Sequence, residues 1–146
     1  MKNRKLRIVM FGLCCIGLVF SVAYPLYIKT MPERAEQIYS AIFNNDGQVY
    51  SVCYEYLKEK GRGYKITTPR DMEDVCKCSV SKTKNVFKKE VIKGFKKNLF
   101  QDFIFIKKAK NLSYTEKQKT INDFVSEAVM FCALAKVSGN EDLMKD

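Results

Sequence analysis

The chain has 146 residues, which is enough for one domain of ordinary size beside a targeting segment and excludes a two-domain protein. Its composition, 47% hydrophobic with only 7 glycines and 3 prolines, excludes a globally disordered chain. The formal net charge is +10 without any histidine, which excludes Ser-His-Asp and Cys-His catalysis and imidazole-ligated zinc or haem sites.

The N-terminus has the pattern of a membrane-targeting segment. Basic residues come first: Lys2, Arg4, Lys5 and Arg7. The uncharged apolar run over residues 8–28 that follows is long enough, as a helix, to cross a bilayer core of about 30 Å. A cleaved signal peptide fits the same stretch, with Ser21–Ala23 as the cleavage site. Tyr24 and Tyr27 favour a retained anchor, because tyrosines collect at membrane interfaces.

This segment predicts the organisation and location of the whole chain. We expect residues 1–29 to be a signal anchor or signal peptide, residues 30–140 a helical extracytoplasmic domain, and residues 141–146 a flexible acidic tail. The positive-inside rule keeps the N-terminus in the cytoplasm. The protein is then a single-pass inner-membrane protein with its C-terminal domain in the periplasm, or is released into the periplasm if the segment is cleaved.

Two short helices are predicted after the targeting segment. Thr30–Glu33 has the pattern of a helix start, with a proline in the first turn, and Asn44–Gly47 ends that helix. The second helix covers about residues 47–60, and Gly61–Gly63 ends it.

The following stretch predicts further helices. Thr68–Asp71 is a capping motif, and apolar residues then recur every three or four positions as far as Phe103. We expect two consecutive helices here, with a bend or break near Ser79–Asn85, where small polar residues cluster. Leu112–Glu116 contains a capping box for the last helix, which Gly139 closes.

The fold class predicted is all-α, with about five short helices outside the membrane. One run, Phe103–Ile106, is apolar at four consecutive positions and fits either a short strand or a helical turn buried on both sides. Length favours the helix.

Four cysteines lie outside the targeting segment, and they predict two disulfides in an oxidising compartment. On a helix the thiols of Cys76 and Cys78 point about 200° apart, so they cannot bond to each other. Each of them is therefore expected to pair with either Cys53 or Cys132, and the sequence leaves both assignments open. Either assignment joins the helix that begins near residue 69 to two other helices.

The Cys-x-Cys spacing also allows a thiol-disulfide oxidoreductase as an alternative. A four-cysteine zinc site normally contains two Cys-x2-Cys pairs, which this chain lacks, so no metal site is expected. A redox-active thiolate favours the first turn of a helix, whereas Cys76 is expected about two turns in.

The cysteines and caps carry one resemblance. Cys53, the Cys76-x-Cys78 pair, the Leu112–Glu116 start and Cys132 together resemble small exported all-helical proteins of Gram-negative bacteria with a C…CxC…C pattern. The resemblance covers residues 50–135, and the group is largely uncharacterised, so it implies a compartment and a fold. This chain departs from the group in being rich in lysine.

Positive charge is concentrated in one part of the predicted domain. Residues 77–119 contain 13 lysines against Glu90, Asp102 and Glu116. A helical projection places Phe87, Val91, Phe95 and Leu99 on one side of a helix, and the lysines of the same stretch on the other: Lys89, Lys93, Lys96 and Lys97. An amphipathic basic helix is predicted.

These lysines are the first part of the predicted binding site. The apolar stretch after them exceeds what one helix face can bury, so it packs between helices or a partner covers it. We therefore expect a partner-binding surface formed by Lys89, Lys93, Lys96, Lys97, Phe100, Phe103 and Phe105.

The functional hypothesis is a non-catalytic, membrane-anchored interaction module. It would be an accessory subunit of an envelope or secretion complex, or an immunity or inhibitor protein. Binding to anionic lipid or lipopolysaccharide is the third alternative. We expect no catalytic residue, no cofactor, no nucleic acid and no small-molecule substrate. The partners are the membrane, through residues 8–28, and another envelope protein or an anionic surface.

Overall fold

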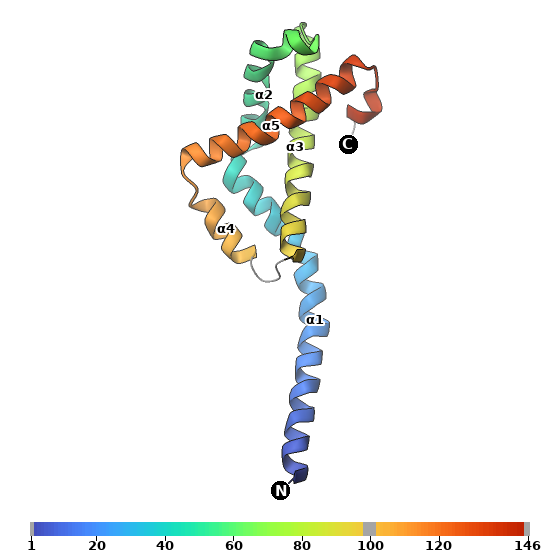
Figure 1. Ribbon diagram of the computed structural model, residues 1–146, viewed down its shortest axis with the longest axis vertical. Coiled ribbons are helices and arrows are strands. Elements are labelled where there is room, and N and C mark those ends of the chain that lie inside the picture. The colour runs from blue at the N-terminus through green and yellow to red at the C-terminus, as the bar shows by residue number, and fades with distance from the viewer. Residues whose placement is uncertain (1, 98–101, 145–146) are drawn as a thin grey trace. The chain divides into compact units, whose positions relative to one another are not determined.

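The computed structural model describes residues 2–97 and 102–144, with backbone alone for residues 2–20, 102, 103 and 141. All the regular secondary structure in this part of the chain is helical and none of it is strand, which confirms the predicted all-α class (Figure 1). The helices are α1 (Lys2–Phe43), α2 (Asp46–Lys60), η1 (Gly61–Tyr64), α3 (Pro69–Lys97), α4 (Asp102–Lys110), α5 (Tyr114–Val137) and η2 (Glu141–Met144). The run at Phe103–Ile106 lies within α4 and is a helix rather than a strand.

The chain divides into two compact units, residues 1–33 and 34–146. The first unit consists of the N-terminal part of α1. Within the described part of the protein, no helix combines the length and the apolar character that crossing a membrane requires. Most of the predicted span over residues 8–28 falls on residues whose side chains lie outside that part.

The helix start predicted at Thr30–Glu33 is wrong, because α1 continues through it to Phe43. Thr30 does not cap a new helix. Its hydroxyl instead donates a hydrogen bond to the carbonyl oxygen of Tyr27, 3.1 Å away, as hydroxyl side chains inside helices do. Pro25 and Pro32 are both accommodated within α1.

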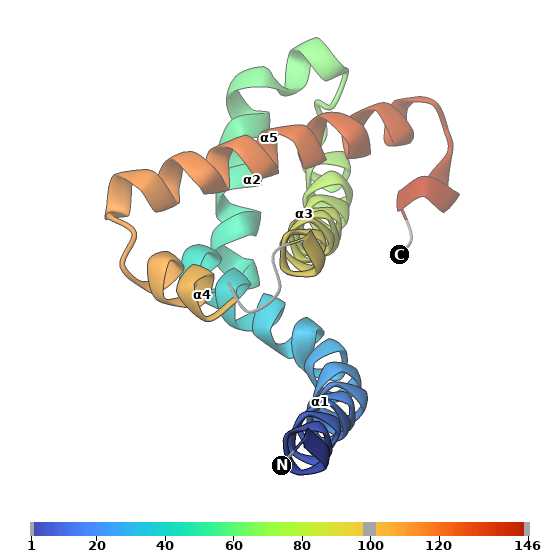
Figure 2. The same cartoon turned by 60° about the horizontal axis from the view of Figure 1, so that its bottom comes forward.

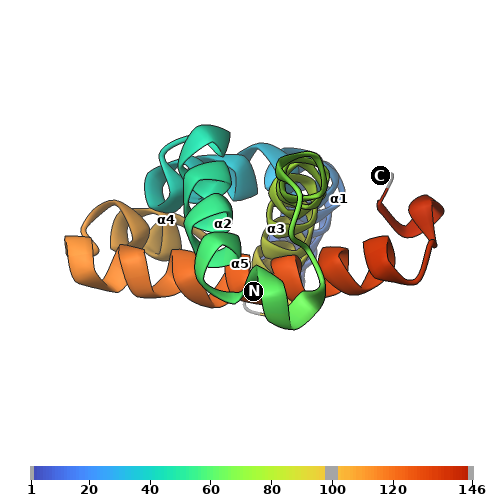
Figure 3. The same ribbon diagram turned by 90° about the horizontal axis from the view of Figure 1, so that it is seen from above.

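Three helices form the framework of the second unit. α2 and α3 lie side by side, and α5 crosses both of them on one face (Figures 1 and 3). A short turn after α4 leads into the start of α5 (Figure 2). The core is built from the faces of α2, α3 and α5 that meet, including Val49, Leu57, Val75, Val125 and Val129.

Two disulfides join these three helices. Cys53 of α2 bonds to Cys76 of α3, and Cys78 of α3 bonds to Cys132 of α5. Cys76 and Cys78 therefore bond to different helices, as the helical geometry requires. The structure also decides the assignment that the sequence leaves open. Three of the four cysteines are fully buried, and Cys78 is 4% exposed.

An aromatic cluster ties the last turns of α1 to the framework. The rings of Tyr39 and Phe43 stack at a centroid distance of 4.6 Å. Phe87 of α3 meets the edge of Phe43 at 5.1 Å, and Phe124 of α5 meets Phe87 at 5.2 Å. Because edge-to-face and offset-stacked pairs are the favourable aromatic geometries, the cluster is a specific contact between these three helices.

Most of the predicted helix ends are confirmed. Asn45 caps α2, and its side-chain oxygen accepts a hydrogen bond from the Gln48 amide at 2.9 Å. Thr68 accepts one from the Asp71 amide at the start of α3. Ser113 and Glu116 form the predicted capping box, and the last helix closes at Gly139, whose φ of 71° suits glycine.

The break predicted at Ser79–Asn85 is wrong, because α3 is one helix of 29 residues. The polar residues there do not compete with the helix. The buried hydroxyl of Ser79 donates a hydrogen bond to the Val75 carbonyl oxygen, 2.7 Å away, and is satisfied inside the helix. Thr83 is buried as well.

A short 3-10 helix follows α5 near the C-terminus. Residues 141–144, the start of the predicted flexible tail, form η2. Lys145 and Asp146 lie outside the described residues.

Candidate binding site

Two groups of lysines on α3 and α4 differ in their ion pairs. Lys84 and Lys88 reach across to Glu36 on α1, and Lys84 also approaches Asp46, at 3.6 Å. The hydrogen bond from Lys88 lowers the pKa of the Glu36 carboxyl below its usual value. Here positive charge is used within the fold.

A second group of lysines makes no ion pair with any carboxylate of the described chain: Lys89, Lys96, Lys97, Lys107, Lys108 and Lys110. All six are exposed. We call them the basic face. Its members lie toward the C-terminal end of α3 and along α4. Charge that is left unpaired in this way is available to an anionic partner.

The predicted site lysines agree in part with this surface. Lys89, Lys93, Lys96 and Lys97 are all exposed, and Phe87 and Phe95 of the same helix are buried, so the predicted amphipathic helix is confirmed. Lys93 differs from the other three, since its amino group lies 3.6 Å from Glu90 one turn away. The sequence prediction did not include Lys107, Lys108 and Lys110 in the binding surface, although three lysines within four positions are a visible signal of a basic patch.

Apolar side chains are exposed beside the basic face. Ile104 of α4 is 64% exposed and Phe105 is 41% exposed. Phe105 also contacts the buried ring of Phe95, at a centroid distance of 6.4 Å. Of the other predicted anchors, Phe100 and the side chain of Phe103 lie outside the described residues. α4 therefore exposes apolar side chains next to unpaired lysines.

An apolar pocket of about 390 Å³ lies between α3 and α4, and we call it the pocket behind α4. Its lining comes from the end of α1, from α3 and α4, from the turn before α5 and from the middle of α5. The charged lining residues are Glu90 and Lys108. The remainder are apolar: Ile38, Ile42, Phe87, Val91, Gly94, Phe95, Phe105, Ala109, Leu112 and Phe124. Side chains of several helices thus leave a concave apolar surface at the edge of the basic face.

Gly94 stands inside α3 and faces open space. A methyl group built on its Cα meets nothing within 4 Å, so no close packing requires glycine at this position. We expect Gly94→Ala to raise the free energy of unfolding by about 0.5–1 kcal/mol, because glycine is costly inside a helix. Urea denaturation measures the change. Gly61→Ala is the control and should destabilise, since the added carbon would lie 2.7 Å from the Ile66 carbonyl oxygen.

The cysteines do not form the pair that a redox site would require. Cys76 and Cys78 are bonded to other helices, not to each other. All four sulfurs of the two disulfides belong to buried residues, out of reach of a substrate thiol. The geometry gives the disulfides a structural role.

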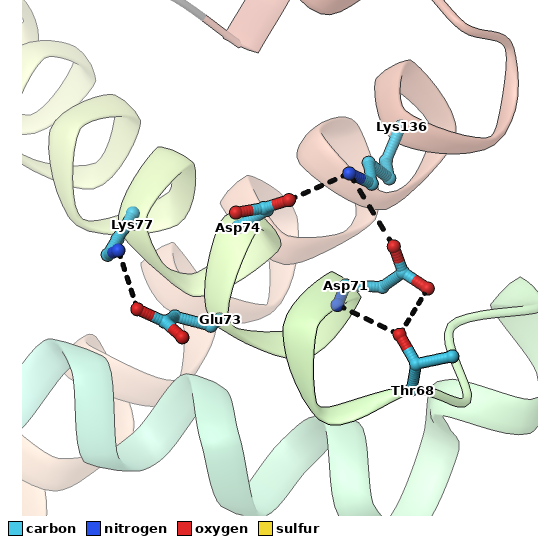
Figure 4. Close-up of polar contacts among 6 residues, drawn as sticks. All are labelled: Thr68, Asp71, Glu73, Asp74, Lys77 and Lys136. Carbon is cyan, nitrogen blue, oxygen red and sulfur yellow. Dashed lines mark hydrogen bonds and ion pairs between the residues drawn. The ribbon is translucent and has the colours of Figure 1, made fainter.

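A cluster of polar contacts joins the C-terminal part of α5 to the first turns of α3 (Figure 4). The amino group of Lys136 on α5 lies 2.7 Å from Asp74 and 3.5 Å from Asp71, both on the first turns of α3. The Asp71 carboxylate also accepts a hydrogen bond from Thr68, and Glu73 pairs with Lys77. The hydrogen bond from Lys136 lowers the pKa of the Asp74 carboxyl.

We expect Lys136→Met to lower the free energy of unfolding by about 0.5 kcal/mol at neutral pH, a small value because the Asp74 side chain is 38% exposed. Because the folded state lowers the pKa of Asp74, this contribution is present above the unfolded value near 3.9 and is lost as the pH falls through the folded value. Urea denaturation at pH 7 and pH 3 should show a smaller difference between variant and wild type at pH 3. A constant difference would contradict the pairing.

A second apolar surface was not predicted from the sequence. Met130, Phe131, Leu134 and Val137 on the outer side of α5 are each more than 40% exposed. Their spacing of three and four residues is the signal that would have shown it. Lys82 lies over the Phe131 ring, at 5.3 Å from its centroid.

The described residues contain no group of three or more acidic or cysteine side chains placed to hold a metal ion. The comparisons with known proteins add no assignment. No family model, no curated protein and no solved structure matches this chain.

Proposed function

We propose that this protein is a non-catalytic interaction module of the bacterial envelope, anchored by residues 8–28, which binds an acidic partner protein through the basic face. The partner would be a component of an envelope or secretion complex, or a toxin that the protein inhibits. The anchor and the location rest on the apolar run and the basic residues before it.

The observation that carries the proposal is the separation of paired from unpaired lysines. Lys84, Lys88 and Lys136 are used in contacts between helices, whereas the six lysines of the basic face make no ion pair within the described chain. The exposed Ile104 and Phe105 lie among the unpaired set. Exposed apolar residues surrounded by charge of one sign suit a partner of opposite charge.

Site-specific photocrosslinking tests this proposal in cells that produce the full chain. Benzoylphenylalanine at Ile104 should give a discrete, protease-sensitive adduct tens of kilodaltons larger than the chain. The same group at Arg62, which is exposed on η1, should not give that adduct.

Two results would contradict the protein partner. One is the absence of an adduct specific to Ile104. The other is that every adduct specific to Ile104 adds only the mass of a lipid and is extracted by organic solvent, which would favour binding to anionic lipid instead.

A further inference from the structure

The pocket behind α4 has the properties of a site for a small apolar ligand. Its volume of about 390 Å³ lies within the range of about 300–1,000 Å³ that is typical of ligand sites. Among the described residues, the lining includes no hydroxyl or amide side chain, and its polar side chains are those of Glu90 and Lys108. The chemistry of the walls therefore suits a hydrocarbon.

The walls of the pocket are held in place by contacts within the fold. Phe87 is 5% exposed and its ring meets Phe124 at 5.2 Å, while Phe95 is 1% exposed and meets Phe105 at 6.4 Å. Because these rings pack against neighbouring rings, the fold itself fixes this part of the pocket wall.

Gly94 lines the pocket without filling it. A glycine inside a helix weakens it, and no neighbouring atom requires one at this position. A larger residue at position 94 would extend into the pocket that Gly94 lines. The absence of a side chain here therefore keeps the pocket open.

The charged residues at the pocket determine which end of a ligand would lie beside them. Glu90 lies 3.6 Å from Lys93 and is partly neutralised. Lys108 makes no ion pair within the described chain, although its charge helps to lower the pKa of Glu116 after the hydrogen bonds from Ser113. An anionic group is therefore complementary to the Lys108 edge of the pocket.

We propose that this pocket binds a hydrocarbon chain with an anionic head group, the chain between α3 and α4 and the head at Lys108. A free fatty acid and one acyl chain of an anionic membrane lipid share this chemistry. The inference goes beyond the proposed function, because it concerns the cavity behind α4 and does not require the protein partner.

Photolabelling of the full chain in a suspension of phosphatidylcholine vesicles tests the ligand. One probe is a palmitic acid analogue with a diazirine in mid-chain, and the other is a phosphatidylglycerol with the same chain. Peptide mass spectrometry should locate label on α3 and α4. Label from the fatty acid alone identifies a free acid as the ligand, label from the phospholipid identifies a membrane lipid, and no label at the pocket from either probe overturns the proposal.

Two variants with matched controls make the result specific. Gly94→Leu should fill the pocket and reduce labelling there at least tenfold, whereas Gly63→Leu, at another glycine with open space around it, should leave labelling unchanged. Lys108→Gln should reduce labelling by the acid several-fold but not by the corresponding alcohol, and Lys60→Gln should affect neither. Equal labelling of wild type and Gly94→Leu would also overturn the proposal, and far-ultraviolet circular dichroism verifies that each variant is folded.

Discussion

Replacing both Cys78 and Cys132 with alanine is expected to lower the free energy of unfolding by about 4 kcal/mol. The bond closes a loop of 54 residues, and the chain-entropy model assigns about that stabilisation to a loop of this length. A domain of this size has a total stability of about 5–15 kcal/mol, so the loss is a large fraction of the whole.

The second disulfide provides the matched comparison. Cys53 and Cys76 close a loop of 23 residues, for which the same model gives about 3 kcal/mol. The four cysteines are almost equally buried, so the cavity left by each pair of alanines is similar and the difference between the variants reports mainly on loop length.

Urea denaturation of the full chain in one detergent measures both variants. The free energy of unfolding is expected to be highest for the wild type, lower for the variant without Cys53–Cys76 and lowest for the variant without Cys78–Cys132. Losses below about 1 kcal/mol for both pairs, or a peptide map that shows a bond between Cys76 and Cys78, would contradict the structure.

The cysteine connectivity shows what the sequence alone determines. Two residues separated by one position on a helix point in different directions, which is a local property of the backbone. The sequence therefore excludes the bond between Cys76 and Cys78 without knowledge of the fold. The choice between Cys53 and Cys132 depends on which helices lie on each side of α3, and that is a tertiary property.

The two incorrect helix boundaries have a common physical cause. Thr30 and Ser79 belong to stretches that resemble helix ends, because hydroxyl side chains often cap helices. In the structure both hydroxyls bond to a carbonyl oxygen of the preceding turn and stay inside a continuous helix. Which of these two hydrogen bonds a hydroxyl makes depends on packing, and periodicity carries no information about it.

The exposure of the lysines could be predicted from the sequence, but the pocket could not. Periodicity places Lys89, Lys96 and Lys97 on one exposed face, because that depends on one helix alone. The pocket needs side chains from α1, α3, α4 and α5 at once. A glycine such as Gly94 has no meaning as a pocket residue until those helices are placed.

Reversing the charge of the basic face is expected to weaken partner binding by about 100- to 1,000-fold. Replacing Lys89, Lys96, Lys97 and Lys110 with glutamate changes the charge by 8 units, and like charges facing each other across an interface cost several kcal/mol. Each 1.4 kcal/mol corresponds to a factor of ten in affinity. The fold should be retained, since these four lysines are exposed and make no ion pair within the described chain.

A second variant with the same change in net charge distinguishes an effect of overall charge from an effect of the basic face. It carries glutamate at exposed basic positions elsewhere in the domain: Lys60, Arg62, Lys65 and Lys119. If binding depends only on net charge, the two variants lose affinity equally. If it depends on the basic face, the second variant binds nearly as well as the wild type.

The most direct test starts from the partner that photocrosslinking identifies. The wild type, the basic-face variant and the second variant are each purified from detergent-solubilised membranes, and mass spectrometry measures how much partner co-purifies with each. We predict that the wild type and the second variant retain the partner and that the basic-face variant loses it, with increasing salt weakening the wild-type complex. Equal recovery with all three proteins would contradict the proposal that the basic face of α3 and α4 is the binding surface.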